Sequence, residues 1–306
     1  MKLCEILTPS FKSIGEELGL KVETFGGRLI TWAPRWRQAL SVESEFCKAL
    51  VSCGYLTERQ MLRAALRYRL GATKTGGVIY WQIDNHEETY EGKIMHYLPN
   101  CHRNKARNAD WVGSALARRY GWGKGTARHC FFGLHQLSKS RFGYTNAVKQ
   151  IDERYVPLCA STGSATAAPE HVALELCSLA TAGTQEGPKG IAIVEAEKTA
   201  VILSEIYPQY IWLAAGGLTQ LQIDKFRPLR GRNLILFPDT DPTGEAYKLW
   251  YETAHTVQQQ LFWEDSPPIH VSDLLERQAS KDQKQRKIDL VDYYFETIKP
   301  SLSSQK

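Results

Sequence analysis

The chain has 306 residues, of which 43% are hydrophobic and 10% aromatic, so it is long enough for two ordinary domains with true hydrophobic cores. This composition excludes a largely disordered protein. No apolar run reaches the length of a membrane-spanning helix, and the N-terminus lacks the apolar core of a signal peptide. We therefore expect a cytoplasmic protein that has no membrane partner.

The net charge of +5 hides an asymmetry between the two halves of the chain. Residues 1–150 contain 23 Lys and Arg against 12 Asp and Glu, whereas the remainder contains 15 against 21. A basic half can bind the phosphates of nucleic acid, and an acidic half can bind cations. This division of charge is typical of an enzyme that acts on nucleic acid.

The first 70 residues predict mainly helices. We expect a short amphipathic helix at Phe11–Leu20, a strand at Arg28–Trp32, and helices at Ser41–Val51 and Thr57–Leu70, with Ser41 and Thr57 as N-caps. Arginines recur along the last of these helices, at 59, 63 and 67. The helix pair is either a helix-turn-helix-like DNA contact or two helices with a solvated basic face.

Two β-rich runs follow, Val78–Asp84 and Ile94–Leu98, and they predict an antiparallel hairpin. Their aromatic residues either form a stacking platform for single strands or are ordinary strand residues. Residues 101–150 then hold ten basic side chains and one acidic one, Asp110. We assign 1–155 to a basic α+β nucleic-acid-binding region, whose candidate contacts are Arg103, Lys105, Arg107, Arg118, Arg119, Lys124 and Arg128.

The seven cysteines are scattered and include no C-x-x-C pair, so the sequence shows no zinc ribbon. We expect reduced thiols that pack as small hydrophobic groups. A metal site at Cys101-His102 and His129-Cys130 is the less favoured alternative.

Residues 156–189 are rich in small and polar residues and predict a linker or insertion, and 299–306 predict a disordered tail. Between them, 190–298 predicts an α/β domain. Apolar runs at 191–194, 210–215 and 233–237 alternate with helical stretches, which indicates a short, mainly parallel sheet flanked by helices.

Three acidic residues follow these apolar runs, Glu195, Asp239 and Asp241. Ligands gather at the carboxyl ends of parallel strands, so we expect the three carboxylates to meet there. Carboxylates this close repel one another unless a cation lies between them. The sequence therefore predicts a site for Mg²⁺ or Mn²⁺.

This array resembles the Toprim domain of bacterial-type primases, topoisomerases and some nucleases. The resemblance is carried by Glu195-Ala-Glu-Lys-Thr199, Gly216-Gly217 and Asp239-Thr-Asp-Pro-Thr-Gly244. The amino-acid sequence around these motifs is most similar to that of primase-like Toprim proteins of plasmids, phages and other mobile elements. The resemblance covers residues 190–275 well and 76–137 more loosely.

The resemblance implies a primase-type nucleotidyltransferase for DNA replication that joins nucleotides on single-stranded DNA, with nucleoside triphosphates as substrates and a replicative helicase as a partner. It implies catalytic and metal-binding roles for Glu195, Asp239 and Asp241. It also places Lys198, Gly216, Gly217 and Gly244 near phosphate or nucleotide.

One position departs from the pattern, because many Toprim enzymes have an acid where this chain has Thr199. This departure leaves open whether one metal or two is bound. A Toprim nuclease with the same acids and a non-catalytic DNA-binding replication accessory protein remain alternatives. A topoisomerase is disfavoured, since 306 residues leave little room for its other domains.

Overall fold

The computed structural model describes residues 21–25, 28–32, 43–120, 129–138, 190–262 and 266–298. The helix expected at residues 11–20, the linker at 156–189 and the tail at 299–306 lie outside these ranges. The chain divides into two units, Met1–Ile151 and Asp152–Lys306, and each is described by itself. Within the described ranges, no helix has both the length and the apolar character needed to cross a membrane.

The first unit contains a sheet with strand order β2-β1-β5-β4-β3, and β6 pairs with β5. The β1–β5 pairing is parallel, and the other pairings are antiparallel. The strands are β1 (Lys21–Phe25), β2 (Arg28–Trp32), β3 (Gly71–Ala72), β4 (Val78–Ile83), β5 (Thr89–Met95) and β6 (Asp110–Trp111).

The predicted hairpin is confirmed as β4 and β5, but its second strand was predicted too late in the chain. Pairing begins at Thr89 and ends at Met95, and Tyr97 forms only an isolated bridge with Arg103. Residues 89–93 are mostly polar, so a hydrophobicity pattern does not identify them as part of a strand. The start of the strand is set by its pairing with β4.

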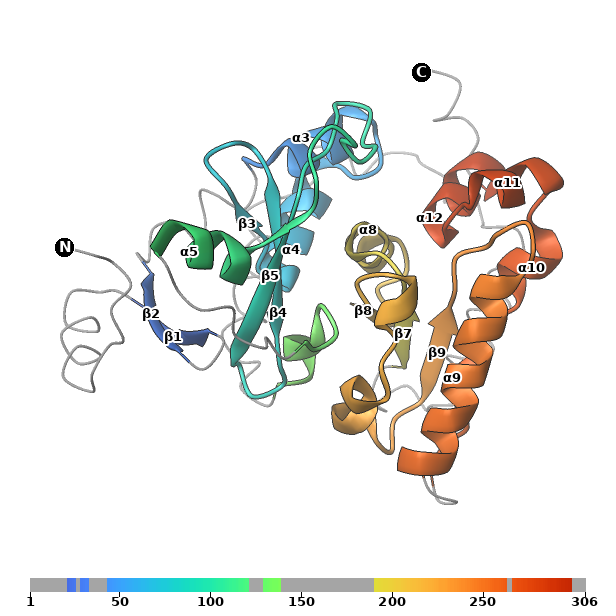
Figure 1. Cartoon of the computed structure of the whole chain (residues 1–306). Helices are drawn as coiled ribbons and strands as arrows, with labels where there is room; N and C mark the ends of the chain where they lie inside the picture. Colours follow the sequence, from blue (N-terminus) through green and yellow to red (C-terminus); the bar gives the residue numbers. More distant parts are fainter. Residues whose placement is uncertain are drawn as a thin grey trace, which may run out of the picture. The chain divides into compact units, whose positions relative to one another are not determined.

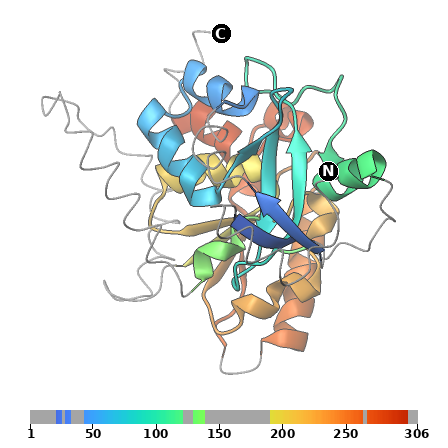
Figure 2. The same cartoon turned by 90° about the vertical axis from the view of Figure 1, so that its left-hand side faces the viewer.

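Helices cover both faces of this hairpin (Figure 2). On one face, helix α3 (Glu45–Ser52) packs against Tyr80, whose ring centroid lies 5.6 Å from that of Phe46. Helix α4 (Glu58–Tyr68) contributes Tyr68, which stacks on Phe132, and the Phe132 ring in turn contacts Tyr80. On the other, helix α5 (Val112–Tyr120) begins with Val112, which packs against Trp81. Adjacent strand residues thus face opposite sides, as the pleat requires.

The N-cap of α4 is Thr57, as predicted, and its capping box includes Gln60. The predicted N-cap of the preceding helix, Ser41, is wrong. The cap is Ser44, whose side chain accepts a hydrogen bond from the Cys47 amide, so α3 starts at Glu45. Two serines, Ser41 and Ser44, lie three residues apart here, and only the tertiary fold selects between them.

Gly92 in β5 provides a test of this packing. It pairs with Trp81, and a Cβ at position 92 would lie 2.8 Å from the Trp81 ring and 2.8 Å from Val112 Cγ2. We predict that Gly92→Ala lowers the free energy of unfolding by about 1–3 kcal/mol through overpacking. Urea denaturation followed by tryptophan fluorescence measures this loss. The exposed-loop change Ala109→Ser is the control, and equal midpoints for the two variants would contradict the prediction.

The second unit contains a fully parallel sheet with strand order β10-β9-β7-β8. Its strands are β7 (Ile191–Val194), β8 (Ile211–Ala214), β9 (Leu234–Phe237) and β10 (His270–Val271). Helix α8 (Glu197–Ile206) lies on one side of the strands and α9 (Glu245–Leu261) on the other (Figure 1). The predicted short parallel sheet flanked by helices is confirmed.

The remaining elements of this unit are short. The 3₁₀ helices η2 (Leu218–Gln220) and η3 (Ile223–Leu229) connect β8 to β9. After β10 the chain forms α10 (Leu274–Gln278), α11 (Lys281–Arg286), α12 (Leu290–Tyr293) and the π-helical turn η4 (Tyr294–Ile298). These C-terminal helices lie at the upper end of the strands in Figure 1.

The strand order creates a topological switch point between β7 and β9. The chain leaves β7 toward β8 on one side and later returns to β9 on the other side. In doubly wound sheets of this kind, ligands bind in the crevice beyond the carboxyl ends of the two strands that flank the switch. The residues that follow Val194 and Phe237 therefore lie where a ligand is expected to bind.

Candidate functional site

The two strands at the switch point bring Glu195 and Asp239 to the same edge of the sheet. Val194 pairs with Phe237 at the end of the ladder, Glu195 follows directly, and Asp239 comes two residues after Phe237. Burial raises the pKa of Asp239 well above its usual value, and the carboxylates of Asp289, Glu195 and Asp292 raise it further. The predicted meeting of Glu195 and Asp239 is thus present in the structure, with two additional acids.

The additional acids, Asp289 and Asp292, come from the C-terminal segment, and sequence reasoning missed them as site residues. Asp289 is buried and caps α12, and its Oδ1 accepts a hydrogen bond from the Asp292 amide at 2.8 Å. The sequence signal was a D-x-x-D capping box, which indicates a helix start and nothing more. Only the fold brings this helix start to the ends of β7 and β9.

Thr199, the position at which the Toprim resemblance leads one to expect an acid, contacts one of these carboxylates. Its Oγ1 donates a hydrogen bond of 2.5 Å to Asp289 Oδ2, between residues 90 positions apart in the chain. This hydrogen bond places the carboxylate of Asp289, the N-cap of α12, next to residue 199.

Lys198 supplies positive charge to the acidic cluster. Its Nζ lies 4.0 Å from Asp292 Oδ1, and its side chain is 16% exposed. Burial and the Asp289 carboxylate raise the pKa of Asp292 to about 6, and Lys198 opposes that rise. Lys198 likewise opposes the rise in the pKa of Asp239. The predicted contact of Lys198 with a phosphate or nucleotide stays a prediction.

Asp241, by contrast, is engaged by the start of α9. Its Oδ1 accepts hydrogen bonds from the Thr243 amide at 2.8 Å and the Thr243 hydroxyl at 2.6 Å, and its Oδ2 accepts one from the Ala246 amide at 2.7 Å. Burial alone would raise the pKa of Asp241, but these hydrogen bonds lower it to about 2. Its observed role is to cap a helix, and its role as a metal ligand stays a prediction.

The predicted glycine loop lies at the same edge of the sheet. Gly216 and Gly217 have φ values of 96° and 149°, which favour glycine, and the Gly216 amide donates a hydrogen bond of 2.9 Å to the Glu195 carbonyl. Lys225, which is buried, donates from Nζ to the Ala215 carbonyl at 3.0 Å. The loop is thus hydrogen-bonded directly to Glu195, the residue that follows β7. Gly244, with φ of 73°, is the N-cap of α9.

The residues of this cluster suit a hard cation in their chemistry. Within the described ranges, no three Asp, Glu, His or Cys side chains gather closely enough to hold one ion by themselves. Mg²⁺, however, usually takes only one or two carboxylates and completes its shell with water and substrate phosphates. The partly buried, mutually repelling carboxylates around Asp239 offer such ligands. The described cysteines, Cys47, Cys53, Cys101 and Cys130, form no disulfide bonds.

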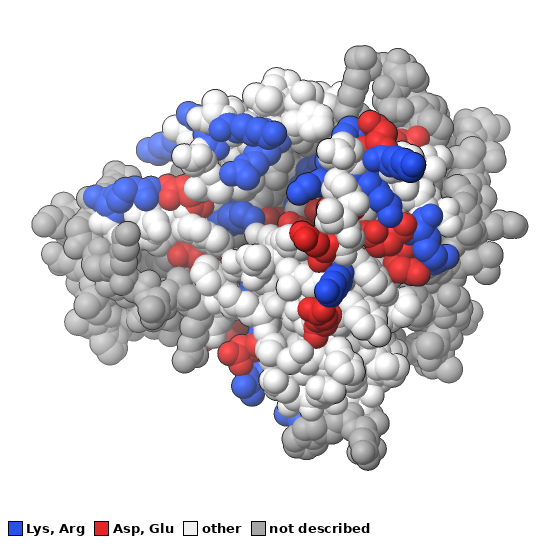
Figure 3. All heavy atoms as spheres, turned by 45° about the vertical axis from the view of Figure 1, so that its right-hand side comes forward, with Lys and Arg blue, Asp and Glu red and all other residues white. Residues whose placement is uncertain are grey.

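The predicted nucleic-acid contacts are only partly described. Arg103 and Lys105 are exposed. Arg107 donates to the Thr75 carbonyl at 3.1 Å and contacts His96, and Arg118 pairs with Asp110. On the face drawn in Figure 3, acidic groups lie against basic ones. Of Arg119 only the backbone is described, and Lys124 and Arg128 lie outside the described ranges.

Fold and site together define a protein with an α/β unit whose strand ends carry an acidic cluster. The chain belongs to the family described as Domain of unknown function (DUF6371), whose model matches residues 44–150 and 175–240, more than half of the chain. The match includes Glu195, Lys198 and Asp239. No curated protein and no solved structure matches the chain.

The capping role of Asp241 gives a first prediction for the site. We expect Asp241→Ala to lower the free energy of unfolding by about 1–2 kcal/mol without any divalent cation, because the first turn of α9 loses its cap. Denaturation in urea, followed by circular dichroism, measures the change. Asp224→Ala, at an exposed ion pair with Arg227, is the control. Equal stability of Asp241→Ala and the wild type would show that the cap contributes nothing.

The raised pKa of Asp292 gives a second prediction, about pH. The folded protein holds this proton more tightly than the unfolded chain, so the group's stabilising effect is full below its ordinary pKa of 3.8 and is lost as pH rises through about 6. In EDTA, Asp292→Asn should therefore melt at a higher temperature than the wild type at pH 7.5, and the difference should shrink toward pH 4. Thermal melts across this range test it, and a difference independent of pH would contradict it.

Proposed function

We propose that the protein is a metal-dependent phosphoryl-transfer enzyme that acts on nucleic acid. The observation that carries the proposal is the convergence of Glu195 and Asp239 at the switch point of a parallel sheet, where Asp289 and Asp292 join them. Phosphoryl transfer needs metal ions that neutralise the phosphate and activate the attacking oxygen. The carboxylates grouped beside Lys198 would meet the first part of that need by holding such an ion.

Within this class we propose a primase-like Toprim nucleotidyltransferase that makes short primers on single-stranded DNA. The parallel sheet, the glycine loop after β8 and the acids after β7 and β9 are compatible with the Toprim resemblance of the sequence. The choice of primer synthesis over cleavage rests on that resemblance. A replicative helicase stays a predicted partner.

In the proposed mechanism, Asp239 and one carboxylate from Asp289 or Asp292 would hold Mg²⁺ or Mn²⁺, with water and substrate phosphate completing the shell and Asp241 as a further candidate. When bound, the ion supplies charge neutralisation at the transferred phosphate. Glu195 would accept the proton of the attacking hydroxyl. Lys198, already within 4.0 Å of Asp292, would contact a phosphate oxygen of the incoming nucleotide.

The first unit would hold the template through its basic surface. Arg103 and Lys105 are exposed and lie in the segment with a single acidic residue between 101 and 150. Such side chains bind phosphates without reading sequence. Binding by the first unit would therefore weaken steeply as salt rises.

A primer assay tests the proposal. Full-length protein is incubated with labelled nucleotides, single-stranded circular DNA and Mg²⁺ or Mn²⁺, and we expect short labelled oligomers. Asp239→Asn should lower their yield by at least about 100-fold, since a carboxylate that carries metal charge is lost. Asp224→Asn, exposed and remote in sequence from the strand ends, should leave the yield unchanged.

Other products would redirect the proposal. Linear or degraded circles without oligomers, lost in Asp239→Asn, would identify a nuclease that uses the same acids. DNA binding without any metal-dependent product would favour the accessory protein and would contradict the enzymatic proposal.

A further inference from the structure

The loop that carries Asp239 is anchored through the residue beside it. Thr240 is 1% exposed, and its Oγ1 donates a hydrogen bond of 2.7 Å to Glu276 Oε1 on α10. Its amide donates to the Ile288 carbonyl at 3.2 Å. The backbone next to Asp239 is therefore held by the C-terminal segment at two points.

The Glu276 carboxylate is shared with a second element. Lys284 on α11 donates from Nζ to Glu276 Oε2 at 3.0 Å and to the Glu276 carbonyl at 2.7 Å. The side chains of Glu276 and Lys284 are 20% and 25% exposed, so water screens the pair only in part. Glu276 thus joins the loop after β9 to helix α11.

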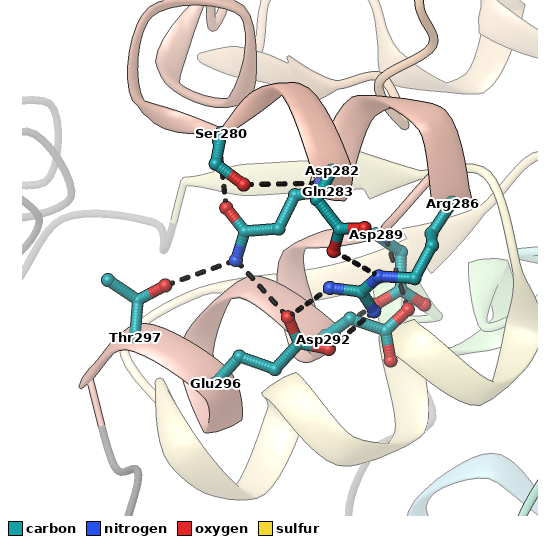
Figure 4. A network of polar contacts seen from close by, with 8 residues as sticks. All are labelled: Ser280, Asp282, Gln283, Arg286, Asp289, Asp292, Glu296 and Thr297. Atoms are coloured by element: carbon teal, nitrogen blue, oxygen red, sulfur yellow. Dashed lines mark hydrogen bonds and ion pairs between the residues drawn. The ribbon is translucent and has the colours of Figure 1, made fainter.

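Helix α11 is in turn fixed to the turn that follows α12 (Figure 4). Arg286 donates to both carboxylate oxygens of Glu296, at 2.8 and 2.7 Å, and also to Asp282 at 2.9 Å. Asp289 and Asp292 lie on the short stretch between these two anchored elements. Their position therefore depends on where α11 is held.

We propose that Glu276 is a positioning residue, which holds Asp239 and the pair Asp289 and Asp292 in one site and thereby sets the affinity of that site for a divalent cation. This inference rests on the proposed function. Residues that orient metal ligands from outside the coordination sphere commonly change metal affinity by about 10- to 100-fold when they are altered. Glu276 has the geometry for such a role, because it contacts the residue beside Asp239 and the helix that precedes Asp289 and Asp292, from which the one or two carboxylate ligands would come.

Two variants break the two halves of this connection. Glu276→Gln retains an oxygen for Thr240 but replaces the carboxylate that binds Lys284. Thr240→Val retains the shape of residue 240 but removes the hydroxyl. Glu252→Gln is the matched control, since Glu252 pairs with Lys248 at 3.9 Å on the exposed face of α9 and its side chain is 63% exposed.

The test uses the full-length protein and two readouts that do not depend on activity. Isothermal titration with Mn²⁺ measures cation affinity, and amide hydrogen exchange measures the order of segments 240–246 and 289–293. We expect both variants to bind Mn²⁺ at least about 10-fold more weakly than the wild type and to exchange faster in these segments. The control should match the wild type in both readouts.

The outcomes separate this inference from the proposed function. If the wild type binds Mn²⁺ and both variants bind it equally well, the inference is overturned and the proposed function stands. If the wild type binds no Mn²⁺, the metal-dependent function and the cation part of the inference are both overturned. In that case, faster amide hydrogen exchange in the variants would support only the role of Glu276 in ordering segments 240–246 and 289–293. Unchanged exchange in both variants overturns the positioning role whatever the metal result.

Discussion

Repulsion between carboxylates at the ends of β7 and β9 is the constraint that the second unit is built to satisfy. Burial and three neighbouring acids raise the pKa of Asp239, so ionising this group carries a cost that the fold must offset. Lys198 offsets part of it with its charge, and the Thr199 hydroxyl offsets part by binding Asp289. A bound cation would offset more, which links the electrostatics of the cluster to the proposed chemistry.

The pKa values of two acids only two residues apart are shifted in opposite directions. The pKa of Asp239 is raised by burial and by other carboxylates, whereas hydrogen bonds from the start of α9 lower that of Asp241 to about 2 despite its burial. When their environments shift the pKa values of neighbouring acids in opposite directions, the two acids have different roles. Asp241 stays ionised and orders the start of α9, whereas the pKa of Asp239 is set by burial and by the neighbouring carboxylates.

The sequence predicted what local patterns encode. The apolar runs gave β7 and β9, and the helical stretches gave α8 and α9, because each is set by burial of contiguous residues. The same reasoning placed Glu195 and Asp239 at one edge. It could not predict Asp289 as a site residue, because its contact with Thr199 joins residues 90 positions apart and its local signal is only that of a helix cap.

The family match ends at residue 240, so it includes Glu195, Lys198 and Asp239 but none of the C-terminal helices. Those helices supply the partner of Thr199, the partner of Lys198 and the anchors of Thr240. The segment that the family model covers therefore holds Glu195, Lys198 and Asp239, and the C-terminal helices add two further carboxylates, Asp289 and Asp292, to the same cluster. For this chain, the acidic cluster belongs to the whole second unit, and the C-terminal helices are part of the site because they supply both its charge and its geometry.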